Sequence, residues 1–365
     1  MADAAAQRAR TLRRQRFGHA MRFPLYIGRR VALLVPQIVL ISFITFALVR
    51  LLPGDPARLA LGPLAPDAAV AALRAKMHLD LPIPQQYLQW LTAALSGDFG
   101  SSWVNNTRVG DDLLHRIPVT LELIVLSLLA VALILVPLAI VTAGHSRHPV
   151  IRVLRSATFG YGMLAGALPD FLLGLLLIFV FFTHLDILPG PEGRLGILDT
   201  SPPFVTGSIL IDTLLAGDLG AFWSGAWHLV MPVFTLAFVY GAPIFKMLRS
   251  QMEVALAAEY TAYGLALGLK RSTVLLRAAR SAAAPTIVIV GTVMMFLLGG
   301  DVLVESVFNL SGVGQYAVQA IVTADYAPVQ GFVCFAAVFT MLIYLAVDLL
   351  HFALDPRVKI GGSPT

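Results

Sequence analysis

Long apolar segments separated by polar connections dominate this sequence. They lie at about residues 31–52, 120–143, 158–182, 228–247, 284–304 and 331–354. A helix needs about 20 apolar residues to span the hydrocarbon core of a bilayer. The chain is 58% hydrophobic and 13% charged, whereas a soluble domain is about 25% charged. The sequence therefore predicts an all-α membrane protein with six transmembrane helices.

The distribution of basic residues predicts the orientation of these helices. The first apolar segment follows a run of arginines: Arg8, Arg10, Arg13, Arg14, Arg16, Arg22, Arg29 and Arg30. If this end is cytoplasmic, the basic connections lie inside and the acidic 183–227 connection lies outside, as the positive-inside rule requires. Both termini are then expected in the cytoplasm. The net charge of +5 is explained by topology, so no nucleic-acid partner is expected.

The predicted transmembrane helices divide the chain into segments. Residues 1–30 are expected to form an Arg-rich cytoplasmic N-terminal tail, 31–52 the first transmembrane helix, and 53–118 an external segment with short helices. Residues 119–354 are expected to form a five-helix core containing a cytoplasmic loop at 249–285, and 355–365 a cytoplasmic tail. The first apolar segment is too long for a signal-peptide h-region and Leu51–Gly54 offers no cleavage site, so we expect this helix to be retained.

The external segment carries helix signals. Asp67 is suited to cap a helix that ends near Met77. A second helix is expected from Pro84 to Leu95, with proline in its first turn and Gly97 beyond its end.

No constellation of residues indicates catalysis. The histidines are scattered without metal-ligand spacing, and the serine-hydrolase pattern Gly-x-Ser-x-Gly is missing. The single cysteine, Cys334, has no partner for a disulfide. Gly264–Ser272 fails the phosphate-loop pattern, because three residues separate its glycines and Leu269 precedes Lys270. We therefore expect no catalytic residue, no metal and no bound cofactor in this chain.

Glu122, Asp170 and Asp348 are carboxylates that lie in or beside the predicted spans. Glu122 and Asp348 are expected to reach interfacial water or to cap neighbouring groups. Asp170 follows Pro169 and is a candidate for the solute pathway, because intramembrane carboxylates are costly and commonly functional. A purely structural role for Asp170 stays open.

The stretch from Glu259 to Pro285 is unusual among the connections. Its four cations, Lys270, Arg271, Arg277 and Arg280, are too many for hydrocarbon. We expect a helix from Met252 to Gly264, a break at Gly268, a second helix from Lys270 to Ala284, and re-entry into the membrane at Pro285. An amphipathic helix lying on anionic lipid is the alternative interpretation.

This stretch resembles the cytoplasmic coupling loop of permease subunits of bacterial ABC importers, in the dipeptide/oligopeptide/nickel permease family. Further resemblances follow in the family's order: LLPGDPARLALG at Leu51–Gly62, LPIPQQYLQW at Leu81–Trp90, GDFGSSW at Gly97–Trp103, PVTLEL at Pro118–Leu123, VLVESVFNLSGVG at Val302–Gly314, DYAPVQG at Asp325–Gly331 and DLLHFALDPR at Asp348–Arg357.

The resemblance implies a type I importer permease fold in the bacterial inner membrane. It implies a second related permease subunit, two ATPase subunits that hold ATP and magnesium, and an external binding protein that delivers a peptide. The loop would lie in a groove of the ATPase. By position, the matching residues are Glu259, Tyr260, Ala262, Gly268, Arg277 and Pro285.

This chain departs from the family pattern within the loop. Ala262-Tyr263-Gly264 stands where the family has Glu-Ala-Ala, Leu267 replaces a polar residue, and Ser281 stands where asparagine is common. Dipeptides, longer peptides, glutathione-like thiols, nickel chelates, opines and sugars all remain open as solutes.

Two other functions are weighed against the importer. An ion-driven secondary transporter predicts buried carboxylates in several spans, whereas only Asp170 lies clearly in the middle of one. A membrane-embedded enzyme needs convergent reactive groups, which the sequence does not offer.

Overall fold

The computed structural model describes residues 28, 32–48, 50, 55–62, 64–77, 79–144 and 148–354. Most of the predicted N-terminal tail, residues 145–147 and the tail at 355–365 lie outside these residues. The described residues are almost wholly helical or in turns, with one isolated bridge between Ser101 and Arg108. The all-α prediction is confirmed.

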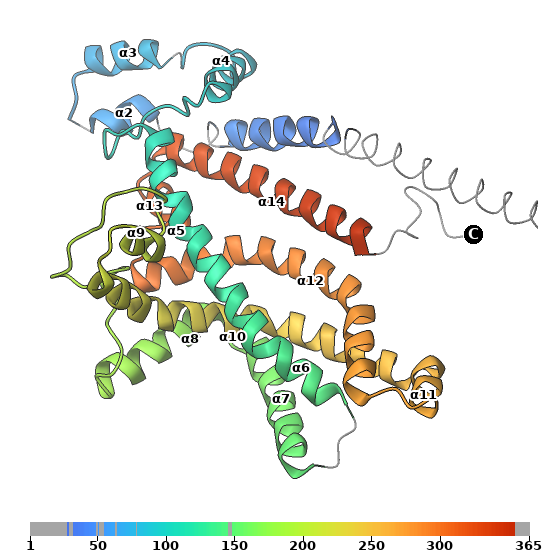
Figure 1. Cartoon of the computed structure of the whole chain (residues 1–365). Helices are drawn as coiled ribbons and strands as arrows, with labels where there is room; N and C mark the ends of the chain where they lie inside the picture. The colour runs from blue at the N-terminus through green and yellow to red at the C-terminus, as the bar shows by residue number, and fades with distance from the viewer. Residues whose placement is uncertain are drawn as a thin grey trace, which may run out of the picture.

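Three short helices gather at one end of the molecule (Figure 1): α2 (Pro56–Leu61), α3 (Asp67–Lys76) and α4 (Ile83–Leu95). Pro84 lies in the first turn of α4, and Gly97 follows its end with a φ of 88°, as predicted. The prediction for Asp67 is wrong. Pro66 takes the capping position and Asp67 is the first helical residue, where its carboxylate pairs with Arg58.

The apolar helix Ala32–Leu48 contacts this group through α4. The Tyr87 hydroxyl donates to the carbonyl of Val39 at 2.9 Å and lies 2.8 Å from the Ser42 hydroxyl. Phe46 packs against Tyr87 and Trp90, with ring centroids 5.6 and 5.7 Å away. The short helices are therefore tied to the first apolar helix by a buried aromatic cluster.

Among the described residues, four helices are long and apolar enough to cross a membrane: Val109–Ala143, Leu219–Ala257, Arg271–Gly299 and Tyr326–Leu350. The first comprises α5 (Val109–Ala130), a π-helical turn η1 (Val131–Leu135) and α6 (Val136–Ala143). It begins well before the predicted apolar segment at 120–143. The second is α10 (Leu219–Ala257), and the others lie within α12 (Arg271–Phe308) and α14 (Tyr326–Leu354).

A fifth span is formed if a bent pair of helices is counted as one. α7 (Pro149–Ala167) meets α8 (Asp170–Leu177), which continues into the π-helical η2 (Ile178–His184), at an angle of 109°. The bend lies at Leu168 and Pro169, which have extended backbone angles. Proline disfavours helical geometry in the residue before it, which explains the bend inside the predicted 158–182 span.

The hydrophobic core lies where α5, α10 and α12 cross (Figure 1). Gly241 of α10 allows a close approach, because a Cβ there would lie 2.4 Å from Cδ1 of Leu135 and 2.8 Å from Cγ2 of Val131. Both partners belong to the π-helical turn of the neighbouring helix. Two short helices complete the fold, α9 (Ile209–Leu215) and α13 (Val313–Val322).

Two expectations for the connection at 249–285 are wrong. The expected helix Met252–Gly264 is broken at Ala258, which has extended angles of φ −69° and ψ 148°. The expected helix from Lys270 to Ala284 does not end at Ala284, because α12 begins at Arg271 and runs without interruption through Pro285 to Phe308. Proline removes one backbone donor, and neighbouring groups in membrane helices compensate for such a loss.

Candidate functional site

The candidate coupling segment is the helical turn between α10 and α12, at the end of the molecule remote from α3 (Figure 1). It contains α11 (Glu259–Ala266), one short helix that packs against both long ones. The Thr261 hydroxyl donates to the carbonyl of Ala255 at 2.8 Å, across the break at Ala258. This bond fixes α11 against the end of α10.

One face of α11 is buried and the other is exposed to solvent. Thr261 and Gly264 are buried, and a Cβ at Gly264 would lie 3.1 Å from Cδ1 of Leu269. Tyr260, Tyr263 and Leu267 are exposed, Tyr263 by 69%. The departure from the family pattern at Ala262-Tyr263-Gly264 is therefore explained by local packing. Gly264 allows Leu269 to approach, and Tyr263 is exposed.

Gly268 forms the turn that follows. Its φ is +80°, a conformation that glycine adopts readily and other residues rarely. The Gly268 amide donates to the carbonyl of Leu265 at 3.0 Å, and the Leu269 amide to that of Gly264 at 3.1 Å. The break predicted at Gly268 is confirmed, and Lys270 occupies the N-cap position of α12 without a capping hydrogen bond from its side chain.

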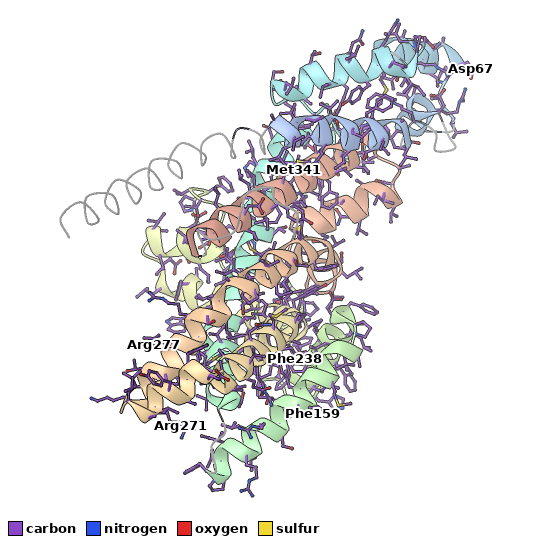
Figure 2. All side chains as sticks on the ribbon, turned by 90° about the vertical axis from the view of Figure 1, so that its right-hand side faces the viewer. Asp67, Phe159, Phe238, Arg271, Arg277 and Met341 are labelled. Atoms are coloured by element: carbon purple, nitrogen blue, oxygen red, sulfur yellow. The ribbon has the colours of Figure 1, made fainter. Side chains whose placement is uncertain are left out.

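Basic side chains lie on the first turns of α12. Arg271, Arg277 and Arg280 are exposed, and Figure 2 places Arg271 and Arg277 at the opposite end of the molecule from Asp67. Among the described residues, neither Arg277 nor Arg280 forms an ion pair. An exposed pair of tyrosines beside unpaired cations suits an acidic and partly apolar partner surface.

The structure brings together most, but not all, of the residues matched to the coupling loop. Glu259, Tyr260, Ala262 and Gly268 share α11 and its turn. Arg277 lies two turns into α12. Pro285 lies about 20 Å along that helix from its start, at a rise of about 1.5 Å per residue, and is half-buried. Pro285 is therefore separate from the exposed surface of α11.

Asp170 lies at the bend between α7 and α8, far from the coupling segment. It is 9% exposed, and its Oδ2 accepts a hydrogen bond of 2.8 Å from the hydroxyl of Tyr240 on α10. Its Oδ1 accepts from the Phe171 amide at 2.6 Å, at the start of α8. Tyr240 and the end of α10 are about 25 Å apart along the helix.

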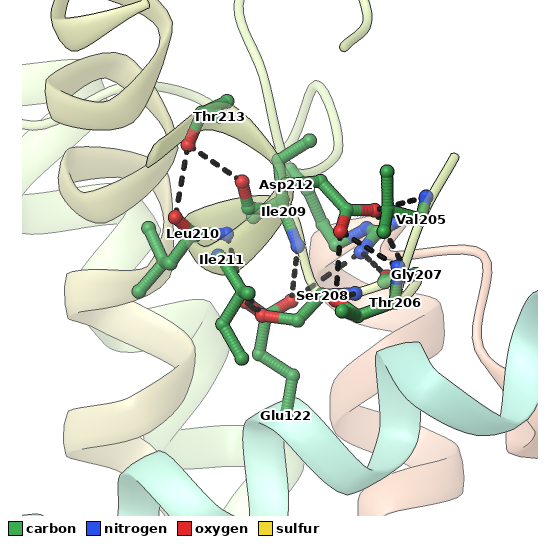
Figure 3. Close-up of polar contacts among 11 residues, drawn as sticks. Glu122, Val205, Thr206, Gly207, Ser208, Ile209, Leu210, Ile211, Asp212 and Thr213 are labelled. Carbon is green, nitrogen blue, oxygen red and sulfur yellow. Dashed lines mark hydrogen bonds and ion pairs between the residues drawn. The ribbon is translucent and has the colours of Figure 1, made fainter. Parts of the chain in front are cut away.

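A second polar cluster joins α5 to the connection between η2 and α10 (Figure 3). Glu122, whose side chain is 4% exposed, pairs with Arg194 at 3.3 Å. Its carboxylate also accepts from the Ser208 hydroxyl at 2.6 Å and from the amides of Ile209 and Leu210, each at 3.1 Å. Glu122 thus caps the N-terminus of α9, which confirms the expected capping role.

Asp212 organises the loop before α9. It accepts from the amides of Val205, Thr206 and Gly207 and from the Thr206 hydroxyl (Figure 3). Burial opposes ionisation of this carboxyl, but the hydrogen bonds outweigh burial and lower its pKa. The connection is therefore a folded structure held by two buried carboxylates, Glu122 and Asp212.

Glu305 forms a third cluster that sequence reasoning missed. It is fully buried on α12, accepts from the Gln315 amide at 2.9 Å and accepts from the Thr120 hydroxyl. Thr120 in turn accepts from the Val313 amide at 3.0 Å. Glu305 and Thr120 thus hold the start of α13. The available signal was the position of Glu305 within the Val302–Gly314 segment, which resembles a motif of the permease family.

In the part of the chain that the structure describes, no three His, Cys, Asp or Glu side chains are grouped so that they could hold a metal ion.

Comparison with known proteins gives the family. Residues 135–360 match the family described as "Binding-protein-dependent transport system inner membrane component", and residues 21–124 match its N-terminal region. The D,D-dipeptide permease protein DdpB of Escherichia coli (strain K12), described as probable, is 37% identical over 325 residues, covering 88% of this chain and 94% of that protein.

Two further relatives cover nearly the whole chain. The dipeptide transport system permease protein DppB of Escherichia coli (strain K12) is 32% identical over 339 residues, and the di/tripeptide transport system permease protein DppB of Pseudomonas aeruginosa (strain UCBPP-PA14) is 33% identical over 343 residues. Each alignment covers 92% of this chain and 98% of the relative. The chain belongs to the family of binding-protein-dependent transport system inner membrane components, and is therefore a multi-pass transport subunit of an ABC importer and no enzyme.

Proposed function

We propose that this chain is one of two related permease subunits that form the path of an ATP-driven importer for peptides or peptide-like solutes. The family and the printed functions of the relatives support a peptide importer over an ion-driven secondary transporter. The bacterial cytoplasmic membrane is the expected location. An external binding protein would deliver the solute, as the family description implies.

The proposed topology has six spans of a type I importer with both termini in the cytoplasm. The helix Ala32–Leu48 would be the first span, and the bent pair α7 and α8 the third. In this arrangement the short helices α2 to α4 lie outside and α11 lies inside. Support comes from their positions at opposite ends of the molecule (Figure 1).

The observation that carries the proposal is the form of the coupling segment. α11 is held to α10 by Thr261 and presents Tyr260, Tyr263 and unpaired arginines to solvent. We assign this surface to an ATPase subunit; two such subunits would bind ATP and magnesium and hydrolyse the ATP. A nucleotide-dependent difference in how the ATPases bind the two permease states would then shift the population between inward and outward forms.

Peptide uptake by the reconstituted complex tests the function. Vesicles containing both permease subunits and the ATPases, supplied with binding protein and labelled dialanine, should accumulate peptide when ATP is present on the ATPase side. Uptake that follows an imposed proton or sodium gradient without ATP would support the secondary transporter.

Charge reversal tests the coupling surface. Arg277→Glu should weaken co-purification of the ATPase about fivefold or more, because arginine is enriched among residues that dominate interface energy. Arg108→Glu, an exposed site at the start of α5, is the matched control and should leave co-purification unchanged. Equal retention of the ATPase by both variants would refute the assignment of this surface.

Asp170 stays a candidate for the pathway. Its contact with Tyr240 joins the α7–α8 bend to α10, so Asp170→Asn is expected to slow uptake while ATPase co-purification stays normal.

A further inference from the structure

A cavity of about 590 Å³ lies between α7 and α10, apart from the coupling segment and the three carboxylate clusters. One end is polar and is lined by Thr158, Arg249 and Glu253. The other end is apolar and is lined by Met163 and Ala167. Because Ala167 ends α7, the apolar end lies beside the α7–α8 bend.

The arginine of this cavity is already neutralised. Its Nε donates to Oε1 of Glu253 at 2.9 Å, and its Nη1 donates to the Thr158 hydroxyl at 3.2 Å. The cavity holds a second cation, Lys246 of α10. Among the described residues Lys246 forms no ion pair. The lining therefore carries one uncompensated positive charge.

Two glycines of α7 determine how Lys246 lies. A Cβ at Gly162 would be 2.8 Å from Cε of Lys246, and a Cβ at Gly166 would be 3.8 Å from its Nζ. The aliphatic part therefore rests on Gly162, and the ammonium extends toward Gly166 and the apolar end. Side chains on a helix lean toward its N-terminus, so Lys246 is directed away from the coupling end of α10. Lys246 is exposed, and its uncompensated ammonium is therefore accessible to an anion that enters the cavity.

We propose that this cavity binds an anionic oxygen group, a carboxylate or a phosphate, on a molecule with an apolar part, and that the Lys246 ammonium is its ligand. The apolar end accommodates the rest of that molecule. Two sources share this chemistry: the terminal carboxylate of a transported peptide, and the phosphate of an anionic phospholipid of the inner leaflet. The peptide source rests on the proposed function, whereas the lipid source does not.

One arm of the test measures how many phospholipid molecules the purified importer retains. The complete importer is purified with wild-type chain, Lys246→Gln, Lys246→Arg or the control Lys76→Gln, which removes the same charge from α3. Each is incubated with dioleoylphosphatidylglycerol, and native mass spectrometry counts the lipids retained. If lipid is the source, Lys246→Gln retains one lipid fewer, whereas Lys246→Arg and Lys76→Gln match the wild type.

The other arm measures how strongly the importer prefers a peptide with a terminal carboxylate, in vesicles of phosphatidylcholine alone. Uptake of dialanine is compared with uptake of dialanine amide, which lacks the carboxylate. If the peptide is the source, Lys246→Gln lowers the preference for dialanine about tenfold, the size expected when a hydrogen bond to a charged group is lost. Lys246→Arg should restore the preference. Gly162→Val, which displaces the lysine and keeps its charge, should act like Lys246→Gln.

Two results would overturn the proposal. One is unchanged lipid retention together with unchanged peptide discrimination in Lys246→Gln and Gly162→Val. The other is loss of the second permease subunit from the Lys246→Gln complex, because the anion would then be a carboxylate of that subunit. If the wild-type complex takes up neither peptide, the proposed function fails and the lipid arm alone decides this inference.

Discussion

Gly312 lies so close to Glu305 that position 312 has no room for a side chain. A Cβ there would lie 2.0 Å from Oε1 of Glu305 and 2.3 Å from its carboxyl carbon. The same carboxylate is fully buried and accepts hydrogen bonds from Thr120 and from the Gln315 amide. The glycine therefore allows the carboxyl group of Glu305 on α12 to cap the start of α13.

Gly312→Ala should displace Glu305 and destabilise the protein. The added methyl group forces the carboxylate away from Thr120 and Gln315, and overpacking of this kind costs about 1–3 kcal/mol. The measurement is the thermal unfolding temperature of the purified subunit in detergent. Gly299→Ala is the control, because its Cβ would meet nothing within 4 Å and alanine favours helix. Equal unfolding temperatures for the two variants would contradict this contact.

The sequence could predict the helices better than their ends. Apolar segments of spanning length located α10 and α14, because burial in lipid demands length and composition that the sequence shows directly. It could not predict that α12 continues through Pro285, since neighbouring packing decides whether a proline ends a helix. The break at Ala258 carries no local signal, because alanine is a strong helix former.

The sites show the same difference between features with a local sequence signal and features that only the fold determines. Gly268 was predictable because its positive φ selects glycine. The pairing of Thr120 with Glu305 was not, because it joins residues 185 positions apart and only the fold brings them together. The capping role of Glu122 was predictable. Its partners Arg194 and Ser208 were not, because they lie in a loop without periodic structure.

Glu122→Ala should release α9 from α5. The substitution leaves the amides of Ile209 and Leu210 without their acceptor and Arg194 without its counter-charge. Each buried group left unpaired costs about 1–3 kcal/mol. Hydrogen exchange should show faster exchange across Ile209–Leu215 and little change in α14. Glu122→Gln keeps an acceptor oxygen and should lose less protection; a larger loss in Glu122→Gln would contradict the capping role.

Acid should open the loop held by Asp212, which lies outside the candidate spans. Hydrogen bonds keep the pKa of Asp212 below its usual range despite burial. A carboxyl whose pKa is lower in the folded state stabilises that state above the unfolded value of about 3.9, and this contribution is lost as pH falls through the folded pKa. Exchange at the amides of Val205–Gly207, corrected for intrinsic rates, should stay slow at about pH 5 and accelerate below about pH 4.

Asp212→Asn is the matched variant for this titration. It cannot ionise, so the same amides should exchange faster at neutral pH, with no further acceleration between about pH 5 and pH 3 after the same correction. An acid transition of equal size in Asp212→Asn would show that another group controls the loop.

Gly268→Ala should impair coupling through backbone strain. A Cβ at this position meets nothing within 4 Å, but φ is +80°, and a left-handed conformation costs other residues about 1–2 kcal/mol. The turn should relax and move α11 relative to α12. Peptide-stimulated ATP hydrolysis by the reconstituted complex should then fall severalfold, while membrane insertion stays normal. Gly268→Asn, which tolerates this conformation better, should retain more activity than Gly268→Ala; the reverse order would show that strain at this turn does not govern coupling.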